Sequence, residues 1–259
     1  MVHVQRFPYH PLLGRHMLLD DRSLPYAIER QETPPTIKPV DHPISIPILD
    51  QSNLLAQGIH VSQLVPGATD VDGLGSCTCN AGTYSLSTSP ALSERVRAAG
   101  EVLDERFAIR LYPKVTRADE YPDVAFPPTD CGSSGLGVCK VLKARGLIGS
   151  YTWATTLEGV AALLQRGSIM FGAPWYEAWF EPGPDGFVDE GGWESSEVAG
   201  GHEFCVVALE TWDERAPENS VIRFPNSWNR SWGDNGYGRM RLATYARLRA
   251  QIDVKQIRV

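Results

Sequence analysis

The sequence predicts an α+β protein built as two lobes. Helix signals are concentrated before Gly167, and strand signals follow it. Helices and strands that occupy separate parts of the chain are typical of α+β folds. We therefore expect a helical lobe over about 70–166 and a strand-rich lobe over about 167–259, with an active site in the cleft between them.

Helices are predicted in four segments before Gly167. They cover residues 77 to about 85, 89 to about 107, 134–143 and 157–165. The second has the clearest start, because Ser89 can cap the helix and Pro90 suits its first turn. The last two stop before Gly146 and Gly167, as helices commonly do.

Strands are predicted after Gly167, separated by loops rich in Gly, Pro and Asp. They cover residues 169–171, 203–210, 221–224 and 239–242. Residues 1–50 contain many prolines, which favour an extended arm over a helix. We expect this arm to pack on a globular domain formed by residues 51–259.

Composition and charge exclude several classes of protein. A net charge of −7, from 24 Lys and Arg against 31 Asp and Glu, argues against nucleic acid as a partner. No segment approaches the roughly 20 apolar residues of a membrane span, and Arg6, Pro8 and His10 leave no secretory signal at the start. Five cysteines, an odd number, favour a reducing compartment. We expect a cytoplasmic protein without a membrane partner, and nothing in the sequence indicates its oligomeric state.

Three short segments carry residues suited to covalent chemistry, and they centre on Cys77, His202 and Asn226. A thiol at the start of a helix lies at the positive end of the helix dipole, which lowers its pKa. A histidine in the other lobe could take the thiol proton and return it to a leaving amine. An asparagine could hold the imidazole in orientation. This order of residues fits acyl transfer through a thioester.

The same segments resemble the signature of papain-like cysteine proteases. Asn226-Ser227-Trp228 and Ser231–Tyr237 are similar to that family's asparagine block, and the distances along the chain from Cys77 to His202 and Asn226 are typical of it. Leu74–Thr78 and Pro127–Gly135 are closer to its bacterial and bacteriophage branch. The resemblance covers roughly residues 15–245.

The resemblance implies a papain-like fold, with a helical left lobe, an antiparallel β-barrel-like right lobe and an active-site cleft between them. It also implies a cysteine endopeptidase for peptide or protein substrates, with no cofactor and no metal. In that mechanism Cys77 attacks the carbonyl, His202 moves the proton and Asn226 orients His202. A phage-encoded member would act in the host cell or with the virion.

Three further residues are candidates for binding the substrate. Gly201 precedes the histidine, Trp228 would shield the contact between the histidine and the asparagine, and Trp175 follows a predicted strand. Packing in the core is an equal alternative for Trp175. A plain packing role is also open for Trp228.

The oxyanion hole is the point where the sequence departs from the family. The family places a glutamine six residues before the cysteine, and position 71 is Val. Leu49-Asp50-Gln51 resembles the missing stretch, followed by about twenty extra residues that would have to loop out. We expect Gln51 and the backbone N–H of Cys77 to stabilise the oxyanion; Gln63 or an altered oxyanion hole are the alternatives.

The other cysteines are not expected to be catalytic. Cys79 and Cys205 should face the core. The Glu203 side chain should point away from His202, so we do not expect it to be the general base. A disulfide between Cys131 and Cys139 is one possibility. The N-terminal arm is too short and too poor in helix to be the usual inhibitory pro-segment, so restraint by such a segment is not evident in the sequence.

Two other functions remain open. One is a different papain-like acyl transfer, such as transglutamination, deamidation or isopeptide cleavage. The other is a noncatalytic structural or binding protein that retains the fold. The displaced glutamine favours the second, and the complete set of Cys77, His202 and Asn226 speaks against it.

Overall fold

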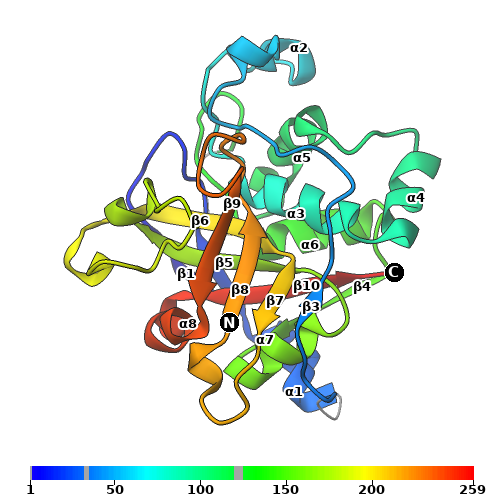
Figure 1. Ribbon diagram of the computed structural model, residues 1–259. Coiled ribbons are helices and arrows are strands. Elements are labelled where there is room, and N and C mark those ends of the chain that lie inside the picture. Colours follow the sequence, from blue (N-terminus) through cyan, green and yellow to red (C-terminus); the bar gives the residue numbers. More distant parts are fainter. Residues whose placement is uncertain (1, 32–34, 120–124) are drawn as a thin grey trace.

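The chain folds around two main hydrophobic cores, one among helices and one against sheets (Figure 1). A computed structural model describes residues 2–31, 35–119 and 125–259. The helical core gathers buried side chains mostly from residues 54–148, and the sheet core mostly from residues 154–254. The predicted α+β fold with two lobes is thereby confirmed.

Five helices of eight or more residues are found in the described part of the chain. They are α3 (Cys77–Ser87), α4 (Pro90–Ala98), α5 (Glu105–Ala118), α6 (Gly135–Ala144) and α7 (Leu157–Leu164). Shorter helices are α1 (Ile28–Gln31), α2 (Val61–Leu64) and α8 (Leu242–Leu248). Helix α3 is buried along its whole length and packs against α5, α6 and two strands of the sheet core, so it is the central helix of the molecule.

The prediction of one helix from residue 89 to about 107 is wrong. Helix α4 ends at Ala98, and Gly100 follows with a φ of 76°, a left-handed conformation that suits glycine. Asp104 then caps a new helix, because its side chain accepts the backbone N–H of Phe107. Two separate helices result, and α5 extends to Ala118.

The strands form two open four-stranded antiparallel sheets. The first has the order β4 (Ser150–Ala154), β10 (Asp253–Arg258), β5 (Ile169–Tyr176) and β6 (Val198–Val206). The second has the order β3 (Val40–Asp41), β7 (Ala208–Thr211), β8 (Val221–Pro225) and β9 (Tyr237–Arg241). The predicted strand 203–210 is therefore two strands, one in each sheet.

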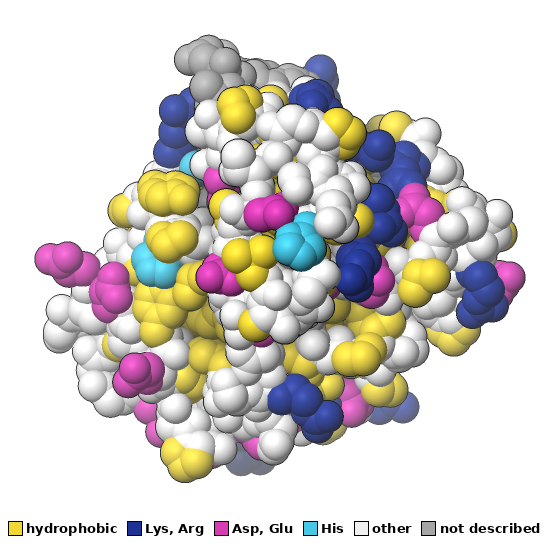
Figure 2. Space-filling view, turned by 90° about the horizontal axis from the view of Figure 1, so that it is seen from above, with side chains coloured by type: hydrophobic (Ala, Val, Ile, Leu, Met, Phe, Trp, Pro, Cys, Tyr) yellow, Lys and Arg dark blue, Asp and Glu magenta, His cyan; other side chains and the backbone are white. Residues whose placement is uncertain are grey.

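The first residues form a hairpin whose connecting loop reaches the boundary between the lobes. Strand β1 (Val2–Gln5) pairs with β2 (Met17–Asp20), so residues 6–16 form a loop held at both ends. None of the helices in the described ranges combines the length and apolar character needed to cross a membrane. Figure 2 shows charged, apolar and polar side chains mixed on one face, with Lys and Arg gathered mainly on the side of α4 and α5.

The extra residues before Cys77 loop out and carry α2, at the top of Figure 1. The backbone N–H of Leu74 donates to the carbonyl of Gln51 over 3.1 Å, which closes the base of this loop. Leu54 and Val61 are fully buried in the helical core. The insertion is thus part of the folded lobe, and it returns the chain to the cysteine block beside Gln51.

Candidate active site

Cys77 is the first residue of α3, where the helix begins against the sheet core. Ser76 precedes it, and the helix buries every one of its side chains. Because α3 packs on β5 and β6, its N-terminus faces the strand that carries the predicted histidine. The helical lobe thus supplies the thiol, and the sheet lobe supplies its partners.

His202 lies on β6 and is fully buried beside Asn226, which follows β8. The His202 Nε2 to Asn226 Oδ1 distance is 2.8 Å, a hydrogen bond that the protonated nitrogen donates. Among the described residues, Nδ1 of His202 has no hydrogen-bond partner. The Cys77 thiol hydrogen bonds to the backbone of Glu203, the residue that follows His202 on β6, so Cys77 lies one residue from His202 along that strand.

Two tryptophans enclose the imidazole. Trp228 stacks on His202 with ring centroids 4.8 Å apart and an interplanar angle of 24°, and Trp175 meets it edge-on at 4.7 Å. Trp175 is fully buried in the sheet core. Both rings restrict the motion of the imidazole.

Gln51 lies at the same boundary, fully buried. Its Oε1 accepts the hydroxyl of Ser227 over 2.7 Å, which fixes the amide. Its Nε2 donates to the carbonyl of Leu74 over 2.9 Å and to the carbonyl of Leu12 over 3.2 Å. The side-chain amide of Gln51 is therefore able to donate to a peptide carbonyl beside the cysteine block.

Two buried side chains that hold these residues in place were missed in the sequence. Glu105, at the start of α5, accepts the Asn80 side chain and the Asp50 backbone N–H, both over 2.7 Å. The Tyr84 hydroxyl accepts the Leu49 N–H over 2.6 Å and donates to the Asn226 carbonyl over 3.1 Å. The signal for Glu105 was its place after the capping Asp104; Tyr84 had none.

The loop of the N-terminal hairpin lies directly over Cys77, a restraint that was not evident in the sequence. The backbone N–H of Gly14 hydrogen bonds to the Cys77 sulfur. The N–H of Arg15 donates to the Gly201 carbonyl over 2.9 Å, and the Gly14 carbonyl accepts the N–H of Ser133 over 2.6 Å. A non-helical backbone thus covers the site, unlike the helical pro-segment of the secreted enzymes.

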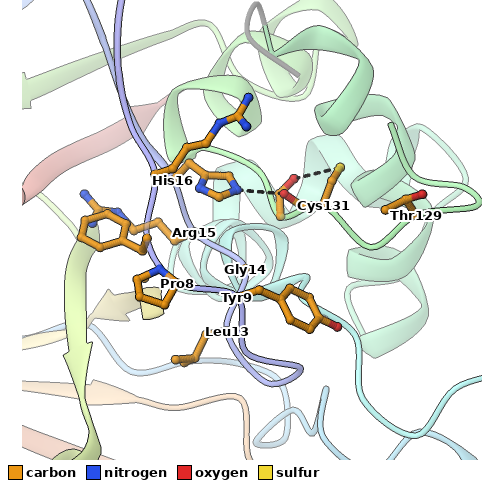
Figure 3. Close-up of a pocket in the computed structure, with 12 residues that line it drawn as sticks. Pro8, Tyr9, Leu13, Gly14, Arg15, His16, Thr129 and Cys131 are labelled. Carbon is orange, nitrogen blue, oxygen red and sulfur yellow. Dashed lines mark hydrogen bonds between the residues drawn. The ribbon is translucent and has the colours of Figure 1, made fainter. Parts of the chain in front are cut away.

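Three glycines make this close approach possible. A Cβ on Gly14 would overlap the backbone of Gly75, and one on Gly201 would overlap the carbonyl of Arg15. Figure 3 shows the arm beside a pocket of about 240 Å³, with His16 directed at the Cys131 carbonyl. The arm is therefore fitted to the site by shape as well as by hydrogen bonds.

Burial dominates the electrostatics of the covered site. It raises the pKa of the Cys77 thiol to about 12, although the backbone N–H groups of Glu203 and Gly14 act in the opposite direction. It lowers the pKa of His202 to about 4, against the hydrogen bond with Asn226. The expected lowering of the thiol pKa at the helix start is outweighed here, because the arm excludes water.

The remaining cysteines are free thiols. Cys131 and Cys139 form no disulfide; Cys131 is half-buried in a loop, and Cys139 is buried in α6. Cys79 and Cys205 are also buried, as expected. No group of three or more His, Cys, Asp and Glu side chains suited to a metal ion occurs in residues 2–31, 35–119 and 125–259.

The fold is that of papain-like cysteine proteases. Xylellain, a cysteine protease from Xylella fastidiosa, aligns with 98% of this chain and 98% of its own at a TM-score of 0.64 and 16% identity. Bromelain from Ananas comosus, in complex with the E64 inhibitor, aligns with 85% of this chain and 98% of its own, at a TM-score of 0.51 and 12% identity. Digestive procathepsin L 3 from Tenebrio molitor larval midgut aligns with 96% of this chain and 77% of its own, at a TM-score of 0.50 and 11% identity. The sequence itself matches no family profile and no curated protein.

Proposed function

We propose that this protein is a cysteine peptidase. The observation that carries the proposal is the hydrogen-bonded pair of His202 and Asn226 on the sheet lobe, next along β6 to Glu203, whose backbone hydrogen bonds to Cys77 at the start of α3. The fold shared with cysteine proteases is consistent with it. The motif around Thr78 favours the bacterial and bacteriophage branch.

The chemistry follows from the positions of the side chains. The thiol proton of Cys77 passes to Nδ1 of His202 as the sulfur bonds to the carbonyl carbon of a peptide. His202 then protonates the leaving amine, and a thioester remains on the sulfur. Water, deprotonated by His202, attacks the thioester and releases the carboxylate and the thiol. The Gln51 amide and the Cys77 backbone N–H would stabilise the oxyanion in both steps.

Gly201, Trp228 and Trp175 have different proposed roles in this site. The Gly201 carbonyl accepts a backbone N–H from the arm, so it can bind the backbone of a peptide in the same way. Trp228 and Trp175 contact the His202 ring, which favours a positioning role for both. Contact with the substrate is the alternative role for both tryptophans.

The test is labelling with an epoxide thiol probe, read by peptide mapping, together with digestion of a peptide library. Because the arm covers the thiol, the full-length chain is compared with its Gly14→Ala variant. We expect labelling of Cys77 that is lost in Cys77→Ala and kept in Cys79→Ala. Mapping matters because Cys131 is the more accessible thiol.

The products distinguish the possible activities. New peptide termini support a peptidase. Release of ammonia from glutamine peptides without backbone cleavage would select deamidation or transglutamination instead. Absence of both, in a folded Gly14→Ala variant whose Cys77 stays unlabelled, would favour the noncatalytic alternative.

A further inference from the structure

The side chain of Arg15 fills a charged pocket next to Cys77. Its guanidinium is fully buried and forms an ion pair with Asp253, and it also donates to the Gln251 carbonyl over 3.1 Å. The centroid of the Phe7 ring lies 5.1 Å from the guanidinium carbon. Arg15 directly follows Gly14, whose backbone contacts the Cys77 thiol. The pocket therefore holds the side chain of the arm residue next to the one that meets the sulfur.

The pocket is formed by one row of residues across three strands. In the antiparallel register Asp253 of β10 pairs with Gly172 of β5, which pairs with Glu203 of β6. Directly opposite residues point to the same face of a sheet. Because the middle residue has no side chain, a gap is left between the two acids, and a Cβ at Gly172 would overlap the guanidinium of Arg15.

The acids in this pocket outnumber its lysine. Asp253 forms a second ion pair with Lys255, and Glu203 interacts with both Lys255 and Arg15. Asp119 also acts on Glu203 and Lys255. When Arg15 is absent, the lysine faces an excess of acids, which leaves either a formal negative charge or a proton taken up by Glu203, whose pKa burial raises. All five side chains are almost fully buried, and an unpaired buried charge is costly.

We propose that this pocket is a substrate subsite selective for arginine, which the arm occupies with Arg15 until a peptide replaces it. The proposal rests on the peptidase function, because it assigns a specificity to the same cleft. A planar guanidinium can pair with Asp253 and the Gln251 carbonyl together, which a lysine ammonium matches poorly. An apolar side chain would leave the buried negative charge without a partner.

The first experiment uses the full chain with Gly14→Ala and Arg15→Ala, which empties the pocket. Peptides carrying arginine, citrulline, lysine or norleucine at successive positions are digested. Citrulline has nearly the shape of arginine without its charge. We expect arginine at one position within two residues of the cleaved bond to be preferred over citrulline by at least about tenfold in kcat/KM.

Further variants connect the preference to the pocket. Adding Asp253→Asn should remove most of the discrimination between arginine and citrulline, whereas Asp213→Asn, an exposed change of the same charge, should leave it intact. Equal cleavage of all four peptides, or a preference that survives Asp253→Asn, would overturn the proposal. In both cases the peptidase function would stand.

Binding separates the pocket from the chemistry. With Cys77→Ala added to the same chain, the affinities of the arginine and citrulline peptides are measured by fluorescence anisotropy. If the Cys77→Ala chain binds the arginine peptide selectively but the chain that keeps Cys77 does not cleave it, the subsite is supported and the peptidase function is contradicted. If the multiple variants do not fold, Arg15→Met and Arg15→Lys in the otherwise intact chain provide the test. Faster epoxide labelling of Cys77 in both variants than in the parent chain supports the proposal. Labelling that is no faster would overturn it.

Discussion

The Cys77 thiol and the His202 imidazole are both held neutral in the covered site. Burial raises the pKa of the first to about 12 and lowers that of the second to about 4, so near pH 7 neither group is charged. A thiolate–imidazolium pair is favoured once water returns, because solvation stabilises both charged forms. The covering loop therefore affects the protonation of the site as well as access to it.

This effect can be measured on His202. We expect it to stay neutral from pH 8 to 5 in the parent chain and to titrate near pH 4. In Gly14→Ala its pKa should rise, since relief of burial favours the imidazolium. Nitrogen-15 NMR of labelled histidines reads the titration, with His202→Gln assigning the signal among six histidines. A His202 pKa near 6.5 in the parent chain would contradict the prediction.

Asn226 should act on catalysis through the orientation of His202. In the Gly14→Ala chain, Asn226→Ala removes the acceptor for Nε2–H, so we expect kcat to fall by about 10–100-fold with a small change in KM. Asn226→Asp retains an acceptor and should keep more activity than the alanine variant. Steady-state kinetics with one peptide checks this. A loss confined to KM would place Asn226 in substrate binding instead.

The hairpin loop of residues 6–16 works as an element because both its ends are held in the β1–β2 pair. The loop is packed tightly when it covers the site, since Gly14 lies against Gly75 and Arg15 is anchored in the charged pocket. A single cut in the loop would leave both strands attached. Displacement of the loop, rather than loss of the first residues, is then enough to uncover Cys77.

Gly14→Ala should uncover the site. The added Cβ would overlap the backbone of Gly75, so the loop cannot seat as before. We expect epoxide labelling of Cys77 to become at least about tenfold faster, because labelling follows the population of the open form. Gly167→Ala is the matched control, since its Cβ would meet the Gln256 side chain only at 3.5 Å. Equal labelling rates in the two variants would show that the loop does not limit access.

Glu105 connects α5 to α3 and to the segment at Asp50, so its protonation should affect the free energy of unfolding. Burial raises its pKa to about 7, above the usual value near 4.5. The stability it contributes is therefore complete below about pH 4.5 and is lost as pH rises through 7. Glu105→Gln should make the free energy of unfolding less dependent on pH between 5 and 8, by up to roughly 3 kcal/mol.

Glu105→Ala gives the matched comparison. It leaves the Asn80 amide and the Asp50 N–H without their acceptor, at about 1–3 kcal/mol each. Urea unfolding across the pH range measures both variants. A pH dependence unchanged by Glu105→Gln would contradict the assigned titration.

At the scale of the whole molecule, the sequence predicted what short segments encode. Helix α3, the capped starts of α4 and α6, and the blocks around Cys77, His202 and Asn226 have local signals. The seating of the loop over the thiol does not, because it depends on Gly14 meeting Gly75 and Gly201 across the fold. Strand β10 was missed because its apolar residues Val254 and Ile257 do not alternate, and because the sequence does not show that Asp253 and Lys255 are buried against charged partners on the arm and on β6.

Strand β10 also explains why the two lobes should unfold together. It lies between β4 and β5, and its Val254 enters the sheet core while its Ile257 enters the helical core. Loss of β10 would therefore expose apolar surface in both cores and leave the edges of β4 and β5 unpaired. The two cores are coupled through a strand from the end of the chain.

Substitutions in each core should therefore shift one common transition. Ile257→Ala in the helical core and Leu164→Ala in the sheet core should each lower the free energy of unfolding by about 2–5 kcal/mol, because both side chains are buried. We expect a single transition in both variants, coincident by tryptophan fluorescence and far-UV circular dichroism. Tryptophans report mainly on the sheet lobe, where those of the sheet core cluster. A second transition in Ile257→Ala, with the fluorescence change left at its parent midpoint, would show that the sheet lobe folds independently and that β10 does not couple the cores.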